Sequence, residues 1–186
     1  MVLPIIAYGD PILRKMSEEI DESYPDLKEF INDMYETMYD SSGVGLAAPQ
    51  VGRSIRLFII DGEKYGEEDE SLLNFKEVFI NPIIIEETGQ EWDFNEGCLS
   101  IPGIREDVRR KPQITLEYYD ENFVLKEEIF DGVAARIIQH EYDHIEGVLF
   151  TDRINPLRRR LLKGKLHNIA KGNIEVDYKM KFPLLK

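Results

Sequence analysis

The chain has 186 residues, of which 42% are hydrophobic and 32% charged, a balance that fits one soluble globular domain and excludes a disordered or membrane-embedded chain. The net charge of −13 argues against broad binding to nucleic acids, and a single cysteine, Cys98, excludes an internal disulfide and fits a reducing compartment. The opening residues lack the basic lead and apolar run of a secretory signal, and no stretch reaches the roughly 18 apolar residues of a spanning helix. We therefore expect a cytoplasmic protein that contacts no membrane and no DNA.

Hydrophobic periodicity predicts one helix and two strand regions in the first half of the chain. Apolar residues recur at helical spacing from Asp26 to about Tyr39. The apolar run from Arg56 to Asp61 predicts a buried strand, and the acidic stretch from Gly62 to Ser71 predicts a loop in solvent. A second strand region spans residues 78–85. Because proline cannot donate to a sheet ladder, the Asn81-Pro82 step in this region predicts an edge or a bulge.

The second half predicts a hairpin, two helices and a final strand. We expect a loop or short strand at 96–102, a hairpin at 114–119 and 123–130, a helix that Asp131 caps and Gly147 ends, a second helix from 157 to about 169, and a last strand at 174–182. Strands lie before and between a few helices without regular βαβ alternation. The prediction is an α+β fold with mixed and antiparallel small sheets packed around a central helix. It forms a single domain of residues 1–186, with a C-terminal helix and strand extension from about residue 157.

The expected central helix carries two histidines four residues apart, in the string Gln139-His140-Glu141-Tyr142-Asp143-His144. On a helix, His140 and His144 share one face about one turn apart, so both imidazoles can point at one metal ion. Glu141 lies on the flank of that face, where it can handle the proton of a metal-bound water, as in the His-Glu-x-x-His sites of metalloproteases. Two core histidines beside a solvated glutamate are the alternative. Since two of the chain's three histidines fall at this spacing, the metal site is favoured.

A catalytic site of this kind takes three protein ligands and leaves one position open. Downstream, His167 lies on a helix rich in Arg and Lys, and Glu146 is too close to His144 to curl back. Cys98 is the better candidate for the third ligand, since it is the sole thiol and follows a glycine that allows tight backbone packing. A buried inert cysteine is the usual alternative for a lone thiol, and the surrounding sequence argues against it here.

Three strings of residues carry that argument. They are Gly43-Val44-Gly45-Leu46-Ala47-Ala48-Pro49-Gln50, Glu96-Gly97-Cys98-Leu99-Ser100 and Gln139-His140-Glu141-Tyr142-Asp143-His144. In this order and spacing they resemble the three signature motifs of the peptide deformylases, and the resemblance runs from Tyr8 to Phe150, over most of the chain. It implies a metal-dependent hydrolase that removes the formyl group from the N-terminal formyl-methionine of newly made bacterial and organellar polypeptides.

The resemblance also implies roles for residues of all three motifs. The metal would have three ligands: Cys98, His140 and His144. A metal held there lowers the pKa of its bound water toward roughly 7, so that hydroxide is available to attack the formyl carbon. Glu141 would accept the water proton and pass it to the departing amine. The Gln50 side-chain amide and the Leu99 backbone N–H would donate to the developing oxyanion, where each such donor is typically worth about 2.7–4 kcal/mol.

The glycine-rich string is expected to bind the substrate. Gly43 and Gly45 have no Cβ, so a peptide can lie extended along Gly43, Val44 and Gly45 and form main-chain hydrogen bonds whatever its sequence. A turn that needs glycine is an equal alternative for Gly43. The resemblance places Arg105 near a backbone carbonyl of the substrate. A further set of residues would orient the ligands: Glu96, Gln139, Asp143 and, paired to Glu96, Arg110.

The C-terminal part of the chain is basic, in contrast to the rest. From Thr151 onward there are ten Lys and Arg residues against three Asp and Glu, whereas the first 150 residues carry 13 basic and 33 acidic ones. Such an asymmetry hints at an anionic partner. The resemblance implies that the helix with Arg158-Arg159-Arg160 docks on the ribosome near emerging chains, and an ordinary solvated helix face is the alternative.

The sequence leaves alternatives open for the identity of the metal and for the class of protein. A thiolate with two imidazoles suits zinc, nickel or cobalt as well as iron, and the resemblance implies Fe(II) as the working ion. A zinc endopeptidase with another third ligand would keep its metal and activity when Cys98 is replaced. A metal-stabilised binding module would have no turnover to lose when Glu141 is changed to alanine.

Overall fold

The computed structural model describes residues 1–185. The α-helices of this part of the chain are α1 (Leu27–Asp40), α2 (Gly132–Ile145) and α3 (Pro156–Ala170). The strands are β1 (Ile5–Ile6), β2 (Gly45–Ala47), β3 (Leu57–Asp61), β4 (Lys76–Thr88), β5 (Trp92–Cys98), β6 (Ile101–Arg110), β7 (Gln113–Tyr119), β8 (Leu125–Asp131) and β9 (Met180–Lys181). Short 3-10 turns are η1 (Pro11–Arg14), η2 (Ala48–Val51), η3 (Glu63–Tyr65), η4 (Glu70–Leu72) and η5 (Phe150–Asp152).

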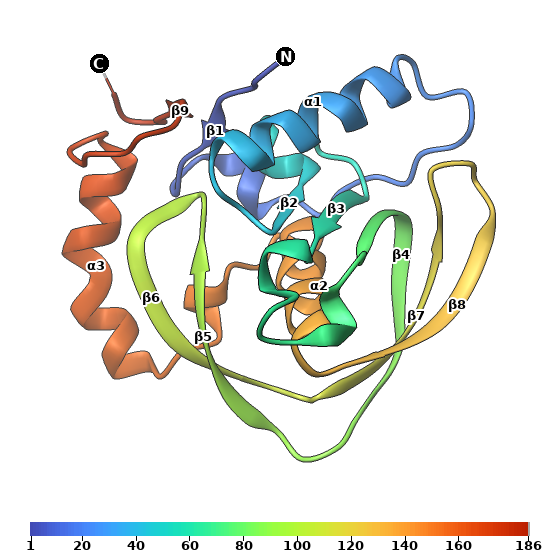
Figure 1. The fold of residues 1–186 in the computed structure, drawn as a ribbon. Coiled ribbons are helices and arrows are strands. Elements are labelled where there is room, and N and C mark those ends of the chain that lie inside the picture. Colours follow the sequence, from blue (N-terminus) through green and yellow to red (C-terminus); the bar gives the residue numbers. More distant parts are fainter. Residues whose placement is uncertain (186) are drawn as a thin grey trace.

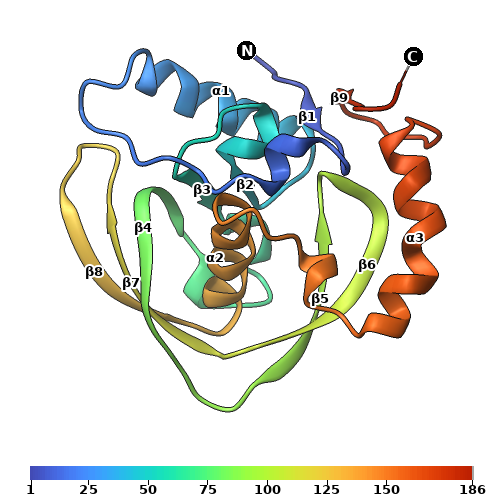
Figure 2. The same cartoon turned by 180° about the vertical axis from the view of Figure 1, so that it is seen from behind.

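Three small sheets surround α2. An antiparallel sheet has the strand order β2-β3-β4-β7-β8, β5 and β6 form a separate antiparallel hairpin, and β1 pairs with β9 in parallel. Both ribbon views place α2 in the middle of the molecule, between the larger sheet on one side and the β5–β6 hairpin with α3 on the other (Figures 1 and 2). The predicted α+β fold with mixed small sheets around a central helix is confirmed.

The apolar faces of α2 explain its central place. Ile138 and Ile145 are fully buried and pack in one cluster with Phe58 of β3. Burying a side chain of this kind contributes about 1.5–3 kcal/mol. The helix follows Asp131 as predicted, but the Asp131 side chain makes no capping hydrogen bond. Beyond the last helical turn Gly147 takes a φ of +73°, a left-handed conformation that favours glycine.

The middle of the chain contains a long hairpin that the sequence pattern did not predict. Residues 96–102 were expected as a loop or short strand, yet β5 continues through Cys98 and β6 begins at Ile101. The strands are rich in charged residues and have cross-strand pairs such as Asp93 with Arg109, and the apolar alternation that marks a strand is limited to Trp92 and Phe94 in β5. The predicted irregularity at Asn81-Pro82 is a shift of register inside β4, which is a central strand and not an edge.

The strand predicted at residues 174–182 is wrong for most of its length, since β9 covers only Met180–Lys181. Side chains at even positions from Ile174 to Phe182 are half-buried and those at odd positions are exposed. The alternation therefore records an extended segment that lies with one side on the body, and it meets a partner strand only at β1. No helix within residues 1–185 is long and apolar enough to cross a membrane.

Candidate active site

Three possible metal ligands from two separate elements meet beside the C-terminal half of α2. His140 and His144 lie one turn apart on the helix, and Cys98 is the last residue of β5. Their ligand atoms all lie within 4.8 Å of one another, and the Cys98 Sγ is 3.3 Å from the His144 Nε2. Metal–ligand distances of about 2.0–2.3 Å put neighbouring ligand atoms about 3.5 Å apart, so the three donors fit one divalent ion.

Glu96, two residues before the cysteine, fixes one histidine ring. Its Oε1 lies 2.8 Å from the His140 Nδ1, which leaves the Nε2 of that ring for a metal. Arg110 donates two hydrogen bonds to the same carboxylate, at 2.8 and 2.9 Å, and Arg136 donates one at 3.2 Å. Burial alone would raise the pKa of Glu96, but the hydrogen bonds from Arg110 and His140 outweigh it and hold this pKa well below its usual range.

Asp143 joins the same network through a shared arginine. Arg110 donates to Asp143 at 2.8 Å, and Arg153 donates to it twice, at 2.6 Å each. Glu96 and Asp143 are both only 4% exposed, so their charges must be compensated inside the protein. One arginine that bridges two buried carboxylates meets this need and ties α2 to β6, the strand that carries Arg110.

Glu141 lies in a different environment from the other two acids. Its side chain is 5% exposed, and among the described residues its Oε2 has no hydrogen-bond partner. Burial raises the pKa of Glu141 to about 7. Gly45 of β2 lies directly against it, since a Cβ at that position would stand 2.6 Å from the Glu141 Oε1. A buried carboxylate without a cationic partner suits the exchange of a proton.

Gln50 reaches the cluster from η2. Its side-chain oxygen accepts a hydrogen bond from the Ala47 N–H at 2.9 Å, which fixes the orientation of the amide. Its Nε2 lies 3.2 Å from the Ser100 Oγ and 3.5 Å from the Cys98 Sγ. The amide group of Gln50 therefore faces the turn that contains Leu99 and the same space as the thiol.

Two other residues predicted for the site make their hydrogen bonds elsewhere. The Gln139 amide donates to Glu87 at 3.0 Å and to the Lys111 carbonyl at 3.3 Å, away from the histidine rings. The Arg105 guanidinium donates to the side-chain and backbone oxygens of Asn95, at 2.8 and 2.9 Å, across the β5–β6 hairpin. Arg105 nevertheless lines the cavity described next.

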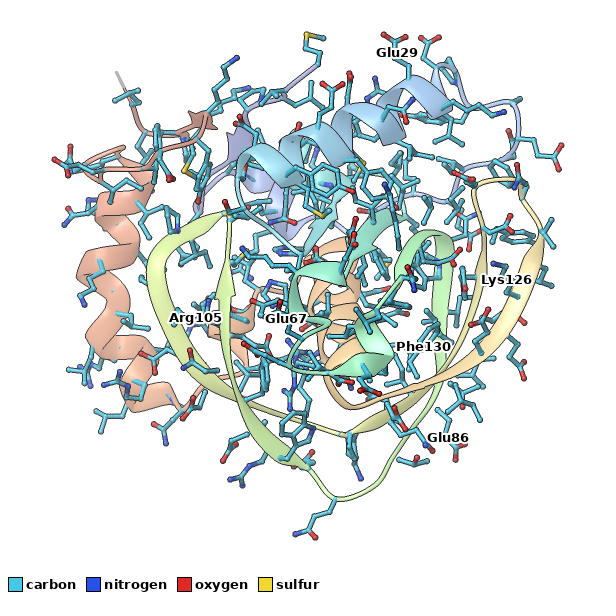
Figure 3. All side chains as sticks on the ribbon, viewed as in Figure 1. Glu29, Glu67, Glu86, Arg105, Lys126 and Phe130 are labelled. Carbon is cyan, nitrogen blue, oxygen red and sulfur yellow. The ribbon has the colours of Figure 1, made fainter. Side chains whose placement is uncertain are left out.

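A cavity of about 880 Å³ opens onto the cluster. Gly43, Val44 and Gly45 line it on the β2 side, and the β5–β6 hairpin lines it on the other. The loop between β3 and β4 also contributes, through residues such as Glu68. Figure 3 shows this loop in front of α2, at the label Glu67, with Arg105 on the hairpin. The acidic loop is exposed as predicted, but it also borders the cavity.

Several residues near the site were not anticipated from the sequence. Arg136 is 2% exposed and stacks on the Trp92 ring at 4.7 Å, and it supports Glu96. It precedes His140 by four residues, so the helical spacing that paired the histidines could also have placed it on their face. Tyr178 lines the cavity from the far end of the chain, and no local pattern signals that contact.

Three possible metal donors beside a buried carboxylate, on the wall of a cavity of about 880 Å³, are typical of a metal-dependent hydrolase. Comparison with known proteins narrows this class. The family model described as polypeptide deformylase matches residues 2–160. The peptide deformylase of Christiangramia forsetii is 58% identical over 193 residues, covering 100% of this chain and 98% of the relative, and that of Flavobacterium johnsoniae is 56% identical with the same coverage.

Solved structures agree with the sequence relatives. A crystal structure of peptide deformylase from Plasmodium falciparum is similar with a TM-score of 0.81 at 36% identity, over 90% of this chain and 95% of the other. One from Legionella pneumophila has a TM-score of 0.80 at 36% identity, over 93% and 98%. The chain belongs to the polypeptide deformylase family and is a hydrolase that removes the N-terminal formyl group from newly made polypeptides. This assignment excludes the endopeptidase and the binding module.

Proposed function

We propose that Cys98, His140 and His144 hold one divalent metal ion and that Glu141 transfers the proton during deformylation. The observation that carries this proposal is the convergence of three donor atoms within 4.8 Å of one another beside a buried carboxylate oxygen that lacks a hydrogen-bond partner within residues 1–185. When bound, the ion supplies a Lewis acid that lowers the pKa of a water ligand. The resemblance to the family favours Fe(II), with zinc, nickel or cobalt as alternatives.

The protein's own groups account for the remaining steps. Glu141 accepts a proton from the attacking water and returns it to the amine that leaves. The Gln50 amide and the Leu99 backbone N–H donate hydrogen bonds to the former formyl oxygen as negative charge builds on it. Each donor of this kind lowers the barrier by about 2.7–4 kcal/mol. The hydrogen bond that fixes the Gln50 carbonyl end supports this role, because its donor end is then aimed before the substrate arrives.

The substrate peptide lies extended between β2 and the β5–β6 hairpin. Support comes from topology, since β2 is an edge strand of its sheet, and the segment Gly43-Val44-Gly45 that leads into it lines the cavity. An edge strand can form main-chain hydrogen bonds with an added strand of any sequence, which an enzyme acting on most new proteins requires. Arg105 lines the same cavity and is proposed to bind a substrate carbonyl.

Purification with and without oxygen, followed by metal analysis and an assay with formyl-Met-Ala, tests the site. We expect more activity after anaerobic purification, as oxidation-sensitive Fe(II) requires. Glu141→Gln should keep the metal and lose nearly all hydrolysis, whereas Cys98→Ala should lose the metal as well. Wild-type turnover in Glu141→Gln would refute the proton-transfer role, and a full metal content in Cys98→Ala would refute the ligand set.

We further propose that α3 contacts the ribosome in the cytoplasm, where formylated chains emerge. Two of its arginines are already paired with the body, Arg158 with Glu106 and Arg159 with Asp152. Arg160, Lys163 and Lys165 are exposed residues of the same helix. Exchanging these three residues for glutamate should abolish co-sedimentation with ribosomes and leave hydrolysis of formyl-Met-Ala intact. If the triple variant binds ribosomes as well as the wild type does, and added salt does not weaken that binding, the contact is refuted.

A further inference from the structure

The chain returns to the active-site cavity after α3. The family model ends at residue 160, yet four later residues line the cavity together with Cys98: Glu175, Val176, Asp177 and Tyr178. In Figure 1 the segment that follows α3 turns back at the upper left of the view to β9, beside β1. Part of the cavity wall is therefore built by a segment outside the matched family region.

This segment is fixed at its far end. The Ile5 N–H donates to the Lys179 carbonyl at 2.8 Å, and the Ala7 N–H donates to the Lys181 carbonyl at 2.9 Å. The Leu184 N–H donates to the Ala170 carbonyl at 3.0 Å, so the chain closes back on the end of α3. These backbone hydrogen bonds anchor the chain directly after residues 175–178, the part that lines the cavity.

Tyr178 contacts the turn that joins β5, the strand that ends at Cys98, to β6. Its hydroxyl donates to the Leu99 carbonyl at 2.8 Å. The next carbonyl in the turn, that of Ser100, accepts from the Tyr8 N–H at 2.8 Å. The hairpin ladder is irregular here, because Gly97 pairs with Arg105 whereas Cys98 pairs with Ile101. The position of the turn thus depends on contacts from outside the hairpin.

We infer that Tyr178 is a positioning residue for deformylation: its hydroxyl holds the Leu99 carbonyl and so aims the Leu99 N–H at the former formyl oxygen. This inference rests on the proposed role of Leu99. The N–H and the carbonyl of Leu99 belong to adjacent peptide groups that share its Cα, so a hydrogen bond that anchors the carbonyl limits how far the Cα and the neighbouring N–H can move.

The test replaces Tyr178 by phenylalanine in the full-length, metal-loaded enzyme. This change keeps the ring that packs against the core and removes only the hydroxyl. A matched control is Tyr35→Phe, since the Tyr35 hydroxyl also donates to a backbone carbonyl, that of Glu77 at 3.2 Å, and does not line the cavity. Both variants should retain the metal content of the wild type.

For Tyr178→Phe we expect kcat for a formyl-Met peptide to fall roughly 3- to 10-fold, the equivalent of one neutral hydrogen bond, with KM changed less than about two-fold. Backbone amide hydrogen exchange at Leu99 and Ser100 should become faster, and Tyr35→Phe should change neither kcat nor exchange in that turn. Unchanged kcat in Tyr178→Phe while the wild type is active overturns this inference alone. A metal-loaded wild type that does not deformylate overturns the proposed function and this inference with it.

Discussion

Replacement of Gly45 by alanine should disable the enzyme by moving one carboxylate. A Cβ at this position would stand 2.6 Å from the Glu141 Oε1, 2.8 Å from its Cγ and 2.9 Å from its Cδ, whereas ordinary van der Waals contact begins at 3.4 Å. The glutamate must therefore shift by about 0.8 Å, the difference between 3.4 and 2.6 Å. Its side chain is 5% exposed and lines the cavity, so the shift moves the carboxylate away from its present place beside the histidines.

A displacement of about 1 Å in a reacting group typically costs on the order of 100-fold in rate, so kcat for formyl-Met-Ala should fall about that much while the metal content stays constant. Gly164→Ala is the matched control, because nothing lies within 4 Å of a Cβ there and the residue is in the middle of α3. That control should stabilise the protein by about 0.5–1 kcal/mol and leave kcat unchanged. If Gly45→Ala keeps wild-type kcat, the packing of Glu141 does not determine catalysis and the argument fails.

Three other changes test the support of the site. Gly147→Ala should lower the free energy of unfolding by about 2–4 kcal/mol in urea titrations, since the residue has a φ of +73° and its Cβ would stand 2.6 Å from the Arg14 carbonyl oxygen. Arg110→Met should cost about 3–5 kcal/mol in the same assay and weaken metal retention roughly 10- to 100-fold, because Glu96 and Asp143 lose a shared partner; unchanged values would contradict the network. A chelator should abolish hydrolysis, and Fe(II) or Ni(II) should restore it; full activity without metal would refute the metal site.

The central helix was predictable because its residues obey one period. The spacing that buries Ile138 and Ile145 also puts His140 and His144 on one face, so the sequence predicts the helix and the histidine pair together. Cys98 could be joined to them only through the resemblance of its surrounding string, because 42 residues separate it from His140 and no periodicity relates the two.

The missed features have physical causes of two kinds. The β5–β6 hairpin has charged cross-strand pairs, and apolar alternation in β5 is limited to Trp92 and Phe94, so the strand signal at residues 92–110 was weak. The segment at 174–182 had the alternation of a strand but mostly lacks a partner strand, since burial of one side produces the same pattern without a sheet. The contact of Tyr178 with the Leu99 carbonyl depends on how the chain returns after α3, which a local pattern does not encode.

The buried acids of this site are of two kinds, those that are hydrogen-bonded to an arginine and one that is not. Glu96 and Asp143 share Arg110, so both belong to one hydrogen-bonded network that supports other residues. Glu141 receives no such partner within the described chain, although it lies two residues from Asp143 and is equally buried. An arginine at Glu141 would favour its charged form and oppose the uptake of a proton. Glu141 packs against Gly45 and not against a guanidinium group, so it remains able to exchange protons while Glu96 and Asp143 support the surrounding residues.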